Sequence, residues 1–485
     1  MLTVTSQFVQ PLDYATDQLE LAAGYSADAW NLRLGYYGSF FDNGADRLRW
    51  ETPFNLSPGA EVGQLDLAPD NDFHQLYFSG GYRFGRHTNL TGKVAIGKGE
   101  QDESFLPYTV NTLLDDGSLP QSNLDGDVDT TNINLRLRST PVRGIGLTAE
   151  YRKSERDNKT SQNQYDYVIT DALPGETVVN RPYSFDRDSY RLSADYRIMR
   201  RTRLSAGWDR DEVDRDFQDR EKTETDRLWA RATVGFTSIV SGWLEFSAEE
   251  RDGSEYMDSA SSGSAENPLM RKYHLADRDR DAIEGQVTVQ PFDVWDFSLS
   301  AVVAEDDYKN TMIGLTESEY MSATLDTSVR AGPVSIYAAY TREEIDSKQN
   351  SSQQFSSPDW TGDTTDEFDT VVVGFQWPEL FSRVDLNLDY TYAKSSGDID
   401  MNVSGARSAF PQLETQLDSV RLYADYRVRE NLKIRAGYWY EHYSSSDWAM
   451  DYVFPATVPH MLSLGANAHN YNVNTVLLSL NYAWQ

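Results

Sequence analysis

The feature that most restricts the fold of this chain is a strict two-residue alternation of apolar and polar side chains. Every second residue from Tyr190 to Ile198 is apolar, and the residues between them are arginine, serine or aspartate. Val420–Val428 and Leu432–Tyr440 repeat the pattern near the C-terminus. This period gives an extended strand one apolar face and one polar face. The sequence therefore predicts β-strands.

Short breaks in the alternation predict nine β-hairpins. Their turns are expected near Ser26, Arg86, Pro141, Arg201, Ile239, Asp293, Gly332, Glu379 and Glu430. A lone strand near Leu2–Phe8 and a last strand over Tyr471–Trp484 bring the expected total to about 20 strands, each long enough to cross a bilayer at a tilt.

Long polar segments separate the hairpins. They are Asp42–Asn71, Glu100–Gly126, Arg156–Tyr183, Asp252–Ala276, Asp346–Asp366, Ser395–Thr415 and Ser444–His469. So many long loops argue against a compact soluble domain, and a propeller repeat of similar length would contain four short strands. Outer-membrane barrels combine short periplasmic turns with long extracellular loops. We therefore predict an all-β fold, with residues 1–485 forming a single large antiparallel transmembrane β-barrel domain in the bacterial outer membrane.

Composition supports this prediction. The chain is 12% aromatic, yet its mean hydropathy is only −0.60. No apolar run approaches the roughly 20 residues that a membrane helix needs. Disordered acidic chains are poor in aromatic residues, so the composition also argues against a disordered chain. A net charge of −32 argues against nucleic acid as a partner.

The apolar faces of the predicted strands have aromatic residues toward their ends, which is typical of the girdles at the two membrane interfaces. We expect this placement, always on the apolar face, for Trp30, Phe40, Tyr82, Phe84, Tyr151, Tyr196, Trp208, Phe236, Tyr340, Tyr390, Tyr392, Tyr438 and Tyr440. The last strand resembles the C-terminal assembly signal of bacterial outer-membrane proteins, although its aromatic residue is Trp484 and the chain ends in Gln485.

The polar faces contain many charged residues, and a soluble core could not hold them unpaired. We expect them to line a lumen that contains water or a polar guest. They are Arg33, Arg83, Lys93, Arg136, Arg138, Glu150, Arg152, Arg191, Asp195, Arg197, Arg231, Glu245, Asp385, Asp389, Arg421, Asp425, Arg427 and Arg435.

A barrel of about 20 strands has a backbone diameter of roughly 40 Å and a lumen of roughly 30 Å. Side chains of the wall fill a barrel only near eight strands, so a lumen this wide needs a constriction or a plug. A siderophore-type transporter would have a globular plug before its first strand, and this chain starts almost directly in a strand. We expect either an inward-folded loop or another protein in the lumen.

Three segments resemble the decahaem-associated outer-membrane β-barrel family of the MtrB/PioB type. They are RLSADYRIMRRTRLSAGWDRDE (Arg191–Glu212), RLYADYRVRENLKIRAGYWYEHY (Arg421–Tyr443) and YNVNTVLLSLNYAW (Tyr471–Trp484). The resemblance rests on strand texture and covers most of the chain. It implies a barrel that sheaths a periplasmic multihaem c-type cytochrome, so that electrons cross the outer membrane, in some cases to or from an extracellular multihaem cytochrome. The haem would be carried by the partner, with no cofactor on this chain.

The alternative is a general solute-diffusion porin with a loop constriction. Outer-membrane lipid and lipopolysaccharide are expected partners of either barrel. Family members are longer, and some have an N-terminal Cys pair that is absent here. The segment Met1–Thr3 has no features of a signal peptide. Because a barrel protein must be exported, we expect either the mature form of the protein or a chain whose upstream portion is missing.

No residue pattern predicts catalysis or a cofactor or metal site. The chain has no Cys, which excludes thiolate metal sites and c-type haem attachment on it, and six scattered His. Asp125–Asp129 is similar to a calcium loop, but Thr130 and Arg136 replace the Gly and Glu that an EF-hand requires. A solvated acidic loop is favoured there. The runs Asp209–Glu221 and Asp277–Asp281 are expected to form ion pairs above the bilayer, with divalent bridging to lipopolysaccharide as the alternative.

Overall fold

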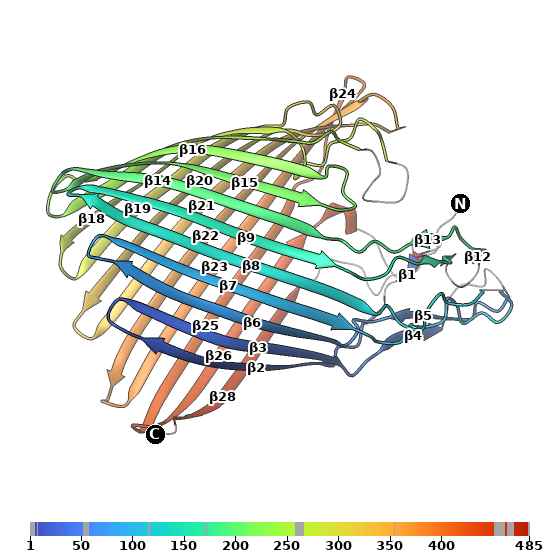
Figure 1. Cartoon of the computed structure of the whole chain (residues 1–485), viewed down its shortest axis with the longest axis horizontal. Coiled ribbons are helices and arrows are strands. Elements are labelled where there is room, and N and C mark those ends of the chain that lie inside the picture. The colour runs from blue at the N-terminus through green and yellow to red at the C-terminus, as the bar shows by residue number, and fades with distance from the viewer. Residues whose placement is uncertain are drawn as a thin grey trace.

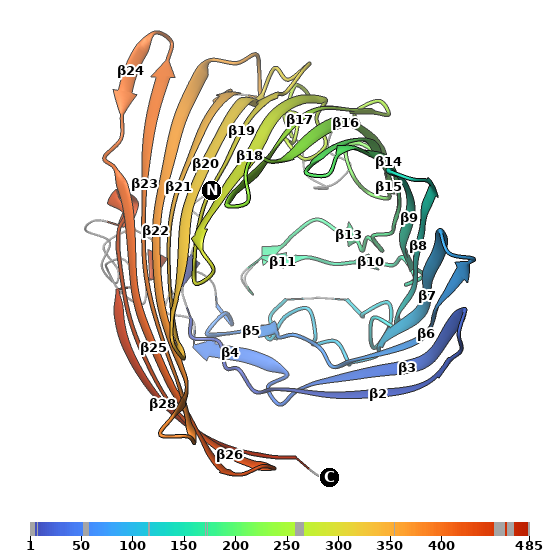
Figure 2. The same cartoon turned by 90° about the vertical axis from the view of Figure 1, so that its left-hand side faces the viewer.

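The computed structural model describes residues 5–6, 8–51, 58–114, 117–169, 171, 173–257, 266–353, 355–450, 461–462 and 470–483. These residues form an all-β structure with one short 3-10 helix, Trp448–Met450. Within the described ranges, no helix has the length and apolar character needed to span a membrane. The dominant element is one antiparallel sheet that curls into a barrel (Figures 1 and 2).

Twenty strands belong to the barrel sheet. In chain order, they are β2 (Tyr14–Ser26), β3 (Trp30–Asn43), β6 (Asn71–Phe84), β7 (Thr88–Gln101), β8 (Gly126–Val142), β9 (Ile145–Asn158), β14 (Phe185–Met199), β15 (Thr202–Arg215), β16 (Lys222–Gly235), β17 (Val240–Gly253), β18 (Arg278–Phe292), β19 (Trp295–Asp307), β20 (Gly314–Ala331), β21 (Val334–Ser351), β22 (Trp360–Leu380), β23 (Val384–Val403), β24 (Ala406–Ala409), β25 (Leu413–Arg429), β26 (Leu432–Ser446) and β28 (Tyr471–Tyr482). The short β24 pairs only with the end of β23.

Consecutive strands pair antiparallel from β2 through to β28. No described residue of β2 pairs with β28, so these two strands are the edges of the sheet. The sheet has nineteen long strands in one antiparallel series, with β2 first and β28 last. Because this number is odd, β2 and β28 run in the same direction, from the long-loop end toward the short-turn end. All thirteen residues of β2 are exposed, as expected for an edge strand.

All nine predicted hairpins are confirmed, with turns between β2–β3, β6–β7, β8–β9, β14–β15, β16–β17, β18–β19, β20–β21, β22–β23 and β25–β26. The lone strand predicted over Leu2–Phe8 is wrong as a barrel strand. Its described part contains only β1 (Thr5–Ser6), which pairs parallel with β27 (Met461–Leu462) away from the barrel sheet. Trp484 and Gln485 lie outside the described residues.

Two of the predicted long loops are largely strand. β21 and β22 extend into Asp346–Asp366, and β23, β24 and β25 occupy most of Ser395–Thr415. Both faces of a strand are polar where it rises above the bilayer, so the apolar alternation disappears while the backbone pairing continues. The other long segments retain loops and short strands. The predicted loop Ser444–His469 lies largely outside the described residues.

The apolar side chains of the strands lie on the outside of the barrel. Leu192, Leu228 and Phe246 are 50%, 63% and 53% exposed. Few large apolar residues are buried anywhere in the described chain. The backbone ladder is therefore the main internal scaffold, and the lipid chains of the membrane cover the apolar face.

Candidate functional site

The inner wall of the barrel is the candidate functional site. Strand alternation puts all the charged residues predicted for the lumen on the face opposite the exposed apolar side chains. The structure adds an interaction among these charges that the sequence pattern alone does not predict. Many of these residues pair with one another across neighbouring strands, because the register places opposite charges side by side.

The longest such ladder crosses four strands, from β14 to β17. The Arg191 guanidinium donates to Asp209 over 2.8 Å, and Arg227 donates to Asp209 over 3.3 Å and to Glu245 over 2.7 Å. Arg231 donates to the second oxygen of Glu245 over 2.7 Å and stacks 4.0 Å from the ring centre of Trp243. The Glu245 side chain is only 7% exposed. Two guanidinium groups therefore neutralise one nearly buried carboxylate.

A second ion-pair group lies near the C-terminal edge. Arg435 of β26 holds Asp425 of β25 through two hydrogen bonds of 2.6 and 2.8 Å. Such a two-point contact fixes the planar guanidinium against the wall. Arg421 lies 4.7 Å from the ring centre of Trp439. On the opposite side of the barrel, Glu150 accepts from both Arg136 and Arg152.

Aromatic rings on the inner wall lie flat over glycines of the neighbouring strand. A Cβ atom built on Gly35 would meet the Tyr77 ring at 2.2 Å, and one on Gly374 would meet the Tyr337 ring at 1.9 Å. The same relation joins Gly207 to Trp229 and Gly437 to Tyr423. Glycine leaves room for a ring to cover the adjacent backbone. The rings therefore line the wall rather than project into the lumen.

These pairs add inward-facing aromatic residues that the sequence analysis does not name. The thirteen aromatic residues named for that face do lie outside, as their strand positions require. Tyr77, Trp229, Tyr337 and Tyr423 lie inside. The signal that could have identified them is a glycine directly opposite the aromatic residue, but this signal requires the strand register.

Gly374→Ala should destabilise the barrel by about 1–3 kcal/mol, because the new methyl group forces the Tyr337 ring from its place and strains the wall. The measurement is urea-induced unfolding in detergent micelles. Gly99→Ala is the matched control, since a Cβ there would meet its nearest neighbour at an ordinary 3.7 Å. Equal midpoints for the two variants would contradict the proposed role of the glycine.

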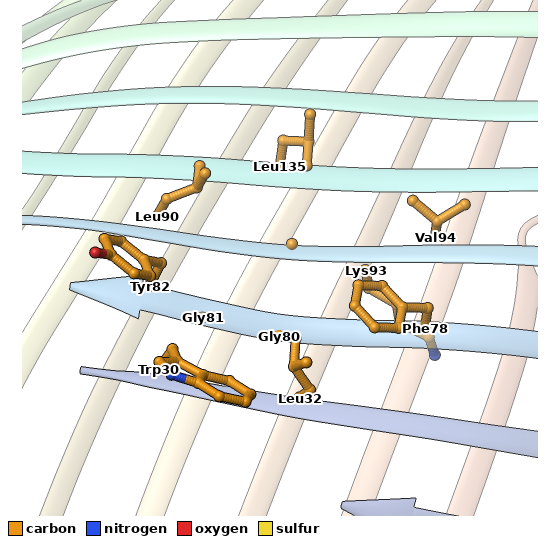
Figure 3. A pocket seen from close by; sticks show the side chains of 11 residues that line it. Trp30, Leu32, Phe78, Gly80, Gly81, Tyr82, Leu90, Lys93, Val94 and Leu135 are labelled. Atoms are coloured by element: carbon orange, nitrogen blue, oxygen red, sulfur yellow. The ribbon is translucent and has the colours of Figure 1, made fainter. Parts of the chain in front are cut away.

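One apolar hollow lies on the outer face of the barrel. Gly80 and Gly92 line it. Trp30, Phe78 and Leu135 are among the side chains around it (Figure 3). Its volume is about 540 Å³. Because it opens on the lipid-facing side, it belongs to the membrane surface. Lys93, also labelled there, has its ammonium 4.9 Å from the inner ring of Tyr77.

Three loops meet across the long-loop mouth of the barrel. The loop after β3 contains the hairpin of β4 (Arg47–Glu51) and β5 (Val62–Asp66), and the loop after β7 contains Asn111 and Gln121. The loop after β9 contains the pairs β10 (Gln164–Tyr165) with β13 (Val178–Val179) and β11 (Val168–Ile169) with β12 (Leu173–Pro174). These elements lie beyond the barrel strands in the side view and within the ring in the end view (Figures 1 and 2).

Polar side chains hold these loops together. Asn111 is 2% exposed and donates to the backbone oxygens of Pro58 and Asp171 over 3.3 and 2.8 Å. Asn163 donates to Gln121 over 3.0 Å. The loops therefore cross the mouth as one connected group. They do not run alongside the middle of the strands in the described chain.

A second loop group lies above β15 to β20. Arg220 donates to the backbone oxygen of Leu275 over 2.9 Å and pairs with Asp277 at 2.7 Å. Lys272 pairs with Asp219, whose side chain is 1% exposed, at 2.6 Å. Partial burial raises the pKa of Tyr256 in the same group. Ion pairs thus tie these loops to one another above the membrane.

The runs predicted to form ion pairs above the bilayer do so in part. Arg210 of the first run pairs with Glu212 at 2.6 Å and with Asp226 at 2.9 Å. Arg280 of the second pairs with Asp306 at 3.1 Å. Asp129 pairs with Lys159 at 2.6 Å. In the described ranges, no three His, Asp or Glu residues are grouped in a way that could hold a metal ion.

Comparison with known proteins identifies the family. The model of the family described as outer membrane beta-barrel porin, MtrB/PioB, matches residues 1–484. The chain is 31% identical over 476 residues to outer membrane protein MtrB of Shewanella baltica, covering 98% of this chain and 67% of that protein. It thus spans about two thirds of the length of that relative.

Solved structures confirm the architecture. A mutant of the ferric enterobactin receptor of Pseudomonas aeruginosa aligns with a TM-score of 0.51 at 10% identity, covering 97% of this chain and 78% of the receptor. The FrpB iron transporter of Neisseria meningitidis aligns with a TM-score of 0.50 at 9% identity, covering 97% of this chain and 80% of the transporter. At these identities the likeness shows the fold alone. The family model matches nearly the whole length of the chain. The chain therefore belongs to the MtrB/PioB family of outer-membrane β-barrels.

Proposed function

We propose that this barrel sheaths a periplasmic multihaem c-type cytochrome and so lets electrons cross the outer membrane. The haem is carried by the partner, and the barrel supplies an insulating wall. The membership of the MtrB/PioB family supports this role. A second, extracellular multihaem cytochrome at the long-loop mouth is part of the same proposal.

The observation that carries the proposal is the character of the inner wall. Many of its charges pair with one another within the wall, and four of its aromatic rings lie flat over glycines. No described segment of the chain runs through the middle of the barrel. With nineteen long strands the bore is about 30 Å wide, which is the scale of a small protein domain. Such a wall favours a folded protein as its occupant.

The alternative is a solute-diffusion porin with a loop constriction. The connected loops across the long-loop mouth favour it, because they could act as a filter at that mouth. They leave the short-turn mouth without a comparable cover among the described residues. A periplasmic protein would enter from that side, since short turns face the periplasm.

Purification of the chain from its native outer membrane in mild detergent tests the proposal. We expect a stoichiometric partner with the visible absorbance of c-type haem. A colourless single-chain preparation that conducts ions in planar bilayers would contradict the proposal and support the porin. Denaturing electrophoresis followed by haem staining serves as the control, because the stain must stay with the partner and not with this Cys-free chain.

A further inference from the structure

The short-turn mouth of the barrel has a strongly asymmetric charge. Three consecutive hairpins, β6–β7, β8–β9 and β14–β15, contribute residues 79–93, 134–150 and 193–207 to this end. Together these segments contain ten Lys and Arg against two Asp and Glu, in a chain whose net charge is −32. The other segments at this end are 20–33, 228–245, 284–300, 322–341, 370–391, 419–440 and 472–483. They contain nine Lys and Arg against twelve Asp and Glu.

Six arginines define this surface, which we call the basic arc. They are Arg86, Arg138, Arg143, Arg197, Arg200 and Arg201, and all six are exposed. None of them forms an ion pair with a described carboxylate, whereas the arginines deeper in the wall do. The arc therefore has positive charge that the barrel itself does not neutralise.

Backbone hydrogen bonds hold the arc in place. Thr140 donates to His87 and Arg197 donates to Gly144, each over 2.7 Å, and these bonds join each turn to the next. The third hairpin is joined onward in the same way by the bond from Gly235 to Arg201, also 2.7 Å. Figure 2, viewed from the short-turn end, places β6 to β15 along one side of the ring. The charges therefore form a fixed, continuous surface on one side of the mouth.

The two arc residues that lie within strands indicate that the arc serves the lumen rather than the lipid. Arg138 and Arg197 lie on inner-face positions. Their outward neighbours Leu137, Tyr196 and Ile198 are 41%, 53% and 44% exposed and face the membrane. A cation at the inner rim faces whatever enters the bore, and a fixed patch of one sign attracts a partner of the opposite sign.

We propose that the basic arc captures and orients an acidic surface of the protein that enters the barrel from the periplasm. This inference rests on the proposed function for the identity of that protein, and it adds the chemistry and the place of its docking. The asymmetry of the mouth gives the guest one preferred rotation, because three consecutive hairpins on one side of the ring have a net positive charge and the remaining segments together have a net negative charge.

The test uses two variants with equal changes in charge. Arg200→Glu/Arg201→Glu reverses the charge of the arc at its third hairpin, and Arg330→Glu/Arg383→Glu reverses two exposed arginines at the same mouth on the opposite side. The probe is fluorescent poly-L-glutamate, titrated against the detergent-solubilised full chain at low salt. We expect wild-type protein to bind it in a salt-sensitive manner, the arc variant to bind about tenfold more weakly, and the control to stay near wild type.

Equal binding by both variants, or no binding by the wild type, would overturn the inference. Loss of binding in nanodiscs of anionic lipid, but not of zwitterionic lipid, would also overturn it by assigning the arc to lipid headgroups.

In native membranes, the arc variant should lose haem protein on a salt wash that leaves the wild-type complex intact. If the wild type and the arc variant retain the haem protein equally, the inference about the arc fails and the proposed sheath function stands. If the wild type has no haem protein, the proposed sheath function fails, and the polyglutamate titration alone tests the binding of acidic surfaces by the basic arc.

Discussion

Leu192→Arg is expected to destabilise the barrel by about 2–4 kcal/mol, the range found for a cation on the lipid face near the bilayer midplane. Leu192 lies in the middle of β14 on the outer face and is 50% exposed to what surrounds the barrel. A guanidinium at this position must either lose its hydration or pull water into the membrane. The measurement is urea-induced unfolding of the chain refolded in phospholipid vesicles, followed by tryptophan fluorescence.

Ser193→Arg is the matched control, because the next residue along β14 points into the lumen. It adds the same side chain at nearly the same depth, and we expect its unfolding free energy to stay within about 1 kcal/mol of wild type. If the two variants unfold alike, or if Ser193→Arg is the more damaging, the assignment of the two faces is wrong.

Glu245→Gln is expected to cost about 3 kcal/mol, because it leaves Arg227 and Arg231 without the carboxylate that both contact. Gln keeps the shape of Glu and one acceptor oxygen, so the loss comes from the charge. The ion-pair ladder links β14 to β17, so its loss should weaken the pairing between these strands first. Urea unfolding gives the free energy, and amide hydrogen exchange of residues 222–253 locates the effect.

Glu284→Gln provides the control for this experiment. Glu284 lies directly opposite Glu245 in the register of β17 and β18, and no ion pair with a described residue involves it. Its neutralisation removes a like charge from the neighbourhood of Glu245, so we expect a change within about 0.5 kcal/mol of wild type. A loss as large as that of Glu245→Gln would show that the ladder is not the source of the stability.

The strands and turns of this fold could be predicted from the sequence because the membrane enforces a simple rule. Lipid on one side and a polar interior on the other require alternation along every strand, as in Tyr190–Ile198. Each hairpin then ends where the alternation breaks, so all nine turns were found. The rule fails above the membrane, where both faces meet water, and the sequence therefore predicts loops at the tall ends of β21 to β25.

The chemistry of the inner wall could be predicted only in part. Sequence alternation placed Arg191 and Glu245 on the inner face, but their partners depend on the register between strands that are far apart in the chain. The flat packing of Tyr77 over Gly35 depends on register in the same way. The basic arc is visible only once the three hairpins are seen side by side.

Single-cysteine labelling gives the most direct test of the central claim, because the chain has no Cys of its own. Leu192→Cys and Ser193→Cys place one thiol on each face of β14, and each is treated with a membrane-impermeant maleimide with and without the haem-containing partner. We predict that Ser193→Cys reacts in the isolated barrel and is protected in the complex, while Leu192→Cys stays unreactive in both. Equal reaction of Ser193→Cys with and without the partner, or rapid reaction of Leu192→Cys in lipid, would contradict a lipid-covered barrel with a protein in its bore.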